Sequence, residues 1–122
     1  MNYLLVFLGG GLGSIFRFGI AQWMAAYKFQ FPWATITANV LACLTLGTLV
    51  GLSMKHKVSE PMGFFLMVGF CGGFSTFSTF TNETFQLMAM EEWGKAFANI
   101  SVSMMVCLLS LFIGVKLGNE GF

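Results

Sequence analysis

The chain has 122 residues and a formal net charge of +1, with 57% apolar residues and only 9% charged residues. Soluble domains carry roughly 25% charged residues, so these numbers exclude a disordered chain and argue strongly against a water-soluble enzyme fold. The charge balance also gives no basic surface for nucleic acid.

Four long apolar stretches divide the chain. About 20 mostly apolar residues suffice to cross a bilayer, and a backbone in lipid must satisfy its own hydrogen bonds, which favours helices. We expect spanning helices at about 3–27, 33–53, 62–90 and 96–117. The sequence therefore predicts an all-α, multi-pass membrane protein whose single transmembrane domain covers residues 1–122.

The lysines give this protein almost no preferred orientation in the membrane. Four spans place both termini on one side, which carries Lys55, Lys57 and Lys116, while the other side carries Lys28 and Lys95. Lysine-rich loops normally stay in the cytoplasm. Either this small bias orients the chain, or the chain inserts in both directions and two opposite copies pair about an axis in the membrane plane.

Each predicted helix carries one pair of glycines spaced four residues apart. These pairs are Gly9/Gly13, Gly47/Gly51, Gly69/Gly73 and Gly114/Gly118. Small residues at this spacing let helix backbones approach closely in lipid, although a chain with 15 glycines produces some matches by chance. We expect the glycines to mark helix contacts and, together with the lysine balance, to favour a homodimer.

The reactive side chains form no catalytic or zinc-binding pattern. Cys43, Cys71 and Cys107 each lie inside an apolar stretch without a CxxC pair, so buried free thiols are favoured over disulfides or a zinc site. The single histidine, His56, lies in a loop beside two lysines. Because no acid and base are paired within the membrane segments, we do not expect an enzyme.

Two polar side chains interrupt the first two predicted helices, where burial in lipid is costly. Arg17 lies midway along the first helix. It either extends to the membrane interface or attracts anions at the vestibule of an ion pathway. Asn39 lies deep in the second helix, and its NH₂ group offers two hydrogen-bond donors. It either joins two helices or donates to a transported anion.

One face of the fourth predicted helix is polar. The side chains on this face are Asn99, Ser103, Cys107 and Ser110. Residues spaced three or four apart share a helix face. Serines in transmembrane helices often bond their own backbone instead, so this stripe does not by itself establish a pathway.

The segment GFCGGFSTFSTFTNETF (69–85) combines adjacent glycines with five hydroxyl side chains between Ser75 and Thr81. Glycine lowers helix propensity and hydroxyls compete for backbone groups, so we expect the third helix to break near Gly72–Thr76. Backbone carbonyls freed by such a break can bind a cation. Phe74, Phe77 and Phe80 recur every third residue. They either fill the core or present ring edges, which carry positive potential, to a small anion.

The segment GFCGGFSTFSTF (69–80) resembles the signature of the Fluc/CrcB fluoride channels. GGGLGSIFRF (9–18) and FPWATITANVLACLTLG (31–47) resemble the first and second helices of the same family. The resemblance covers essentially the whole chain. It implies a dual-topology antiparallel homodimer in the cell's inner (plasma) membrane, with two pores through which fluoride leaves the cytoplasm passively.

The resemblance also implies roles for individual residues. Phe77 and Phe80 correspond to the paired pore phenylalanines, and Asn39 to the pore asparagine. The remaining side chains of the implied polar track are Ser78, Thr79, Ser103 and Cys107.

A structural Na⁺ is implied at the dimer centre, bound by backbone carbonyls of Gly72 and Ser75. Glu83 matches the acidic residue that follows the family signature. The chain departs from the family at Ser75, where threonine is frequent, and at Cys107 and Leu111, where hydroxyls are common.

Two other functions remain open from the sequence. A small four-helix coupled exporter also has dual topology, but such proteins carry a buried glutamate in their first helix. Here that helix carries Arg17 and no acid. A non-transporting membrane assembly protein is the other alternative.

Overall fold

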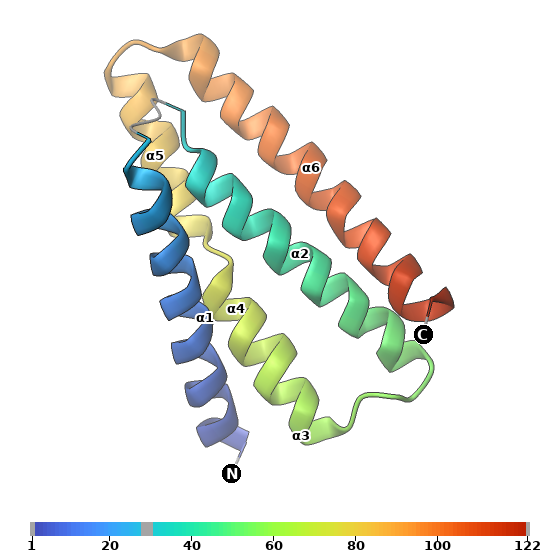
Figure 1. Ribbon diagram of the computed structural model, residues 1–122. Coiled ribbons are helices and arrows are strands. Elements are labelled where there is room, and N and C mark those ends of the chain that lie inside the picture. Colours follow the sequence, from blue (N-terminus) through green and yellow to red (C-terminus); the bar gives the residue numbers. More distant parts are fainter. Residues whose placement is uncertain (1, 28–30, 122) are drawn as a thin grey trace.

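The computed structural model describes residues 2–27 and 31–121, and every regular element in these ranges is helical (Figure 1). The elements are α1 (Asn2–Ala25), α2 (Trp33–Met54), α3 (Glu60–Gly63), η1 (Phe64–Cys71), α4 (Gly72–Phe74), α5 (Phe77–Ala89) and α6 (Trp93–Glu120). The third expected span comprises α3 to α5. Lys28, one of the lysines counted for orientation, lies outside the described residues.

Four of these stretches are long and apolar enough to cross a membrane: Asn2–Ala25, Trp33–Met54, Glu60–Ala89 and Trp93–Glu120. This confirms that the chain has four long apolar helices and is a multi-pass membrane protein. In Figure 1, α1 and the stretch from α3 to α5 run in one direction, whereas α2 and α6 run in the other. Both marked chain ends therefore lie at the same end of the bundle as the loop between α2 and α3.

The first pair of glycine motifs joins α1 to the first half of the third span. A Cβ at Gly9 would overlap the Phe65 carbonyl, and a Cβ at Gly13 would overlap the Phe70 carbonyl. Facing them, Gly69 and Gly73 lie against the backbone of Gly9 and Gly10. The two backbones thus touch without side chains between them, in parallel register.

The second pair of glycine motifs joins α2 to α6. A Cβ at Gly47 would overlap the Leu111 carbonyl and approach the Gly114 Cα to 3.1 Å. Gly51 and Gly118 repeat the arrangement one turn further along. All four motifs are therefore used inside one chain, which confirms that they mark helix contacts. These glycine faces are covered within the chain, and the homodimer stays a prediction.

The third span breaks where the glycines and hydroxyls predict. Ser75 (φ −80°, ψ 154°) and Thr76 (φ −148°, ψ 122°) are extended, so α4 ends before them and α5 begins after them. The Thr76 hydroxyl caps α5 by accepting from the Thr79 amide at 3.2 Å. The π-helical geometry of Phe64–Cys71 was not predicted, and its apolar sequence does not distinguish it from an α-helix.

The glycine contacts predict the result of adding a single methyl group. Gly47→Ala forces α2 away from three backbone atoms of α6 and should lower the free energy of unfolding by about 1–3 kcal/mol. Gly11→Ala is the matched control, because a Cβ there meets nothing within 4 Å and alanine improves helix propensity by up to about 1 kcal/mol. Unfolding in detergent, followed by circular dichroism, compares the two. Equal stability of both variants would contradict the packing.

Candidate functional site

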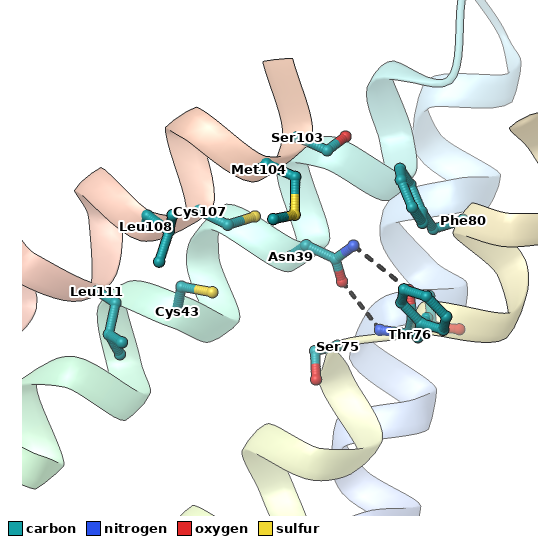
Figure 2. Close-up of a pocket in the computed structure, with 11 residues that line it drawn as sticks. Asn39, Cys43, Ser75, Thr76, Phe80, Ser103, Met104, Cys107, Leu108 and Leu111 are labelled. Atoms are coloured by element: carbon teal, nitrogen blue, oxygen red, sulfur yellow. Dashed lines mark hydrogen bonds between the residues drawn. The ribbon is translucent and has the colours of Figure 1, made fainter. Parts of the chain in front are cut away.

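The break in the third span is held by one side chain of α2. Asn39 Oδ1 accepts a hydrogen bond from the Thr76 amide at 2.9 Å, and Asn39 Nδ2 donates to the Thr76 carbonyl at 3.4 Å (Figure 2). The amide side chain therefore replaces two helical partners of an extended residue. Of the two N–H bonds on Nδ2, one serves this contact and the second is available to another acceptor.

Arg17 reaches the same break from α1. Its Nε donates to the Gly73 carbonyl at 3.2 Å, across 56 residues of sequence. A cation next to the carbonyls at the end of a helix interacts favourably with the helix dipole. The structure thus places Arg17 against the break, half-buried, and its attraction of anions at a vestibule stays a prediction.

A cavity of about 330 Å³ opens between α2, the break, the start of α5 and α6. The residues that line it are Asn39, Cys43, Ser75, Thr76, Phe77, Phe80, Ser103, Met104, Cys107, Leu108 and Leu111. Figure 2 shows these side chains converging from three directions on the space beside Asn39. Five of the seven residues predicted for the pore therefore share one cavity: Asn39, Phe77, Phe80, Ser103 and Cys107.

Ser78 and Thr79 do not line this cavity. Ser78 is exposed, and its Oγ lies 3.4 Å from Thr76 Oγ1. The Thr79 amide donates to the capping hydroxyl of Thr76. Both residues instead belong to the first turn of α5, so their predicted place on the polar track is not supported by this cavity.

The two predicted pore phenylalanines lie together at the start of α5. Their ring centroids are 5.7 Å apart with an interplanar angle of 43°. Phe77 is 78% exposed in the single chain, so it does not fill this chain's core. Phe74, the third member of the repeat, is buried against Ala38 and Ala42 and is a core residue.

The polar face of α6 forms a buried network. Asn99, which has no exposed surface, donates from Nδ2 to the Thr84 hydroxyl at 2.8 Å. The Ser103 hydroxyl donates to Asn99 Oδ1 at 3.2 Å. Ser110 bonds its own backbone at the Val106 carbonyl, at 2.6 Å. In this arrangement the proton of Ser103 points away from the cavity, toward Asn99.

Glu83 of α5 is a half-buried acidic residue that lies near the first turn of α2. Its Oε1 is buried and has no hydrogen-bond partner within the described residues. The Thr35 hydroxyl of α2 lies beside the carboxyl group. Buried carboxylate oxygens without partners are costly, so this atom is poised to accept a donor that the described part of the chain does not supply.

The carbonyls of Gly72 and Ser75 are the predicted cation ligands. In a continuous helix the Thr76 amide would bond the Gly72 carbonyl and the Thr79 amide would bond the Ser75 carbonyl. Here those amides bond Asn39 and the Thr76 hydroxyl instead. Both carbonyls thus lose their helical donors, and such hard oxygen ligands fit a hard cation.

Some of the cavity was not predicted from the sequence. Cys43, Thr76, Met104 and Leu108 were missed as lining residues. For Cys43 a signal existed, because it lies one turn after Asn39 on the same helix face. Met104 and Leu108 carry no polar signal, and only the packing of α6 places them here.

Known proteins resemble this chain over nearly its full length. Residues 4–115 match the family described as "CrcB-like protein, Camphor Resistance (CrcB)". A protein of Thermus thermophilus named "Fluoride-specific ion channel FluC" is 40% identical over 118 residues, which cover 96% of this chain and 93% of the relative. A protein of Pyrococcus horikoshii with the same name is 42% identical over 117 residues, covering 95% and 94%.

A third relative of that name, from Shewanella loihica, is 36% identical over 95% of this chain and 94% of its own length. The family's match and these identities extend across all four spans and both sides of the helix break. This chain therefore belongs to the CrcB-like family.

Proposed function

We propose that this protein is a passive, fluoride-selective ion channel that exports F⁻ from the cytoplasm across the plasma membrane, and not an enzyme. The observation that carries the proposal is the cavity at the helix break, where Asn39, the Phe77–Phe80 pair and the α6 face meet. The relatives named as fluoride-specific channels support the choice of ion.

The cavity suits a small anion that must be bound weakly enough to leave. Fluoride is strongly hydrated, so closely placed donors must replace its water, and conduction requires each site to release it again. The second N–H of Asn39 and the positive edges of two phenyl rings provide neutral donors of this kind. Ser103 contributes its proton only when its bond to Asn99 opens.

A passive channel accounts for these features better than the alternative functions. A coupled cation exporter needs a titrating acid at the centre of its pathway, whereas Arg17 is the charged side chain at this break. A non-transporting assembly protein gives no reason for a polar network buried beside a cavity.

We also propose that two copies assemble as an antiparallel homodimer with two pores. The single chain leaves the cavity open on one side and Phe77 exposed. Within residues 2–27 and 31–121, Glu83 Oε1 also has no donor. A second, inverted copy would supply the missing wall, and the near-even lysine distribution allows both orientations to insert.

A structural Na⁺ at the centre of that dimer completes the proposal. The Gly72 and Ser75 carbonyls would hold it, and the ion would neutralise the carbonyl dipoles that two helix breaks bring together. Because the ligands are backbone atoms, Ser75→Ala should keep its sodium. Atomic emission measures the sodium that remains after exchange into choline buffer. Unmodified protein that retains no sodium would refute the site.

The phenylalanines give the direct test of the pathway. Phe77→Ile and Phe80→Ile keep a large apolar side chain but lose the ring edge, so fluoride efflux should slow at least about tenfold, equivalent to about 1.4 kcal/mol in the barrier. Efflux from fluoride-loaded liposomes, read with a fluoride electrode, measures the rate. Phe7→Ile is the matched control, since Phe7 is similarly exposed at 74% but lies on α1 outside the cavity. Parent rates in both α5 variants would contradict the pore assignment.

The orientation proposal has its own test. Three lysines added after Phe122 should favour one orientation and reduce the yield of dimer, because added positive charge keeps its side in the cytoplasm. Three added glutamines are the control and should leave the yield unchanged. Accessibility of a terminal tag from each side of the membrane reports orientation. A tag accessible from only one side in the unmodified protein would contradict dual insertion.

A further inference from the structure

Three sulfur-containing side chains share the wall of the cavity beside Asn39. Cys43 comes from α2, and Met104 and Cys107 come from α6. The Cys107 thiol lies within interaction range of the Cys43 thiol. Figure 2 shows all three sulfur atoms on the side of α2 and α6 that faces the cavity. Of the three, Cys107 alone belongs to the proposed fluoride pathway, and its thiol is only weakly polar.

Two thiols and a thioether select a particular class of ion. Thiolate and thioether sulfur are soft ligands that favour Cu⁺, whereas hard cations prefer oxygen. A tetrahedral zinc site is not supported, since the described residues contain no group of three or more His, Cys, Asp and Glu able to hold a metal. We propose that Cys43, Cys107 and Met104 form a binding site for a soft monovalent cation, Cu⁺ or Ag⁺, whose occupation obstructs the fluoride pathway.

A neighbouring cavity offers a competing set of sulfur atoms and is the weaker candidate. It measures about 120 Å³ and is lined by Cys43, Met67 and Cys71, among others. Met67 Sδ already accepts a contact from the Ser53 hydroxyl at 3.9 Å, and Cys71 is only 3% exposed. The cavity beside Asn39 is larger and more accessible, so it is the one to which we assign the ion.

The charge of the occupied site follows from its ligands. Binding exchanges the S–H bonds of both cysteines for sulfur–metal bonds and releases two protons to water. Two thiolates and one monovalent cation leave the site with a net charge of −1, while the thioether binds as a neutral ligand. No oxidant or reductant is consumed. Because fluoride is a hard ligand, it does not compete for the soft ion.

A metal ion bound at this site would narrow the fluoride pathway. The three sulfur ligands come from two helices, so one ion bound to all of them draws their side chains together across the cavity. Met104 and Cys107 are three residues apart on α6 and line the cavity together with Asn39, so the narrowing occurs beside Asn39. Fluoride efflux should therefore fall as the site fills.

Silver is the probe that tests the site in the intact protein. Purified protein in chloride-free nitrate buffer should take up one Ag⁺ per chain. The bound Ag⁺ should protect Cys43 and Cys107 from reaction with maleimide, as read by mass spectrometry. Cys43→Ser and Cys107→Ser should each weaken uptake by at least about 10–100-fold, the range seen when even an outer-shell partner of a metal is lost. Cys43→Ala and Cys107→Ala serve as second variants if a serine variant fails to fold, and Met104→Leu should weaken uptake less.

Cys71→Ser is the matched control and should bind silver like the parent. Ag⁺ should also stop fluoride efflux from liposomes of the parent and of Cys71→Ser, but not of Cys43→Ser. Unchanged uptake in a Cys43→Ser/Cys107→Ser double variant, or loss of uptake only in Cys71→Ser, would overturn the site. Uptake without any slowing of efflux would overturn the obstruction. A parent protein that carries no fluoride would refute the proposed function and leave the binding result standing.

Discussion

The structure depends on the two hydrogen bonds between Asn39 and the backbone of Thr76. A helix that breaks inside a membrane exposes amides and carbonyls that lipid cannot satisfy. Asn39 accepts from one such amide and donates to one such carbonyl, while Arg17 serves the Gly73 carbonyl on the opposite side. These contacts allow α5 to restart in a new direction, which brings Phe77 and Phe80 to the cavity. The same contacts leave the Gly72 and Ser75 carbonyls without helical donors.

The glycine contacts pack α1 closely against the first half of the third span, where Arg17 bonds the Gly73 carbonyl. Contact of α1 with η1 and α4, and of α2 with α6, is made backbone against backbone at the glycines. The close pairing of α2 with α6 also brings Cys43 next to Met104 and Cys107 in the wall of the cavity. The same glycines therefore determine how the helices pack and which side chains meet at the break and in the cavity.

Much of this fold could be predicted because lipid imposes simple rules on a sequence. The four spans follow from apolar length alone, and the break at Ser75–Thr76 follows from adjacent glycines and hydroxyls. The partner of each glycine motif could not be predicted, because a GxxxG pair specifies closeness without naming the facing helix.

The candidate site could likewise be predicted only in part, because helix packing decides which residues line the cavity. For Asn39 the sequence allows either joining helices or donating to an anion, and its NH₂ group carries one N–H for each role. Ser78 and Thr79 lie in the first turn of α5, outside the cavity of the single chain, and their place on the polar track stays a prediction. Cys43 and Met104 were missed because residues that line a cavity need not be polar.

The parallel pairing of helices distant in sequence has a consequence for synthesis in the membrane. The partner of α1 begins after residue 60 and the partner of α2 only after residue 93, so each early helix enters the bilayer before its glycine face can be covered. Arg17 then has no Gly73 carbonyl to bond, at an insertion cost of about 2.5–3.5 kcal/mol. A chain that stalls or is truncated before its third span thus carries two exposed glycine faces and an unpaired cation, which are features by which membrane quality control can distinguish unfinished chains from finished ones.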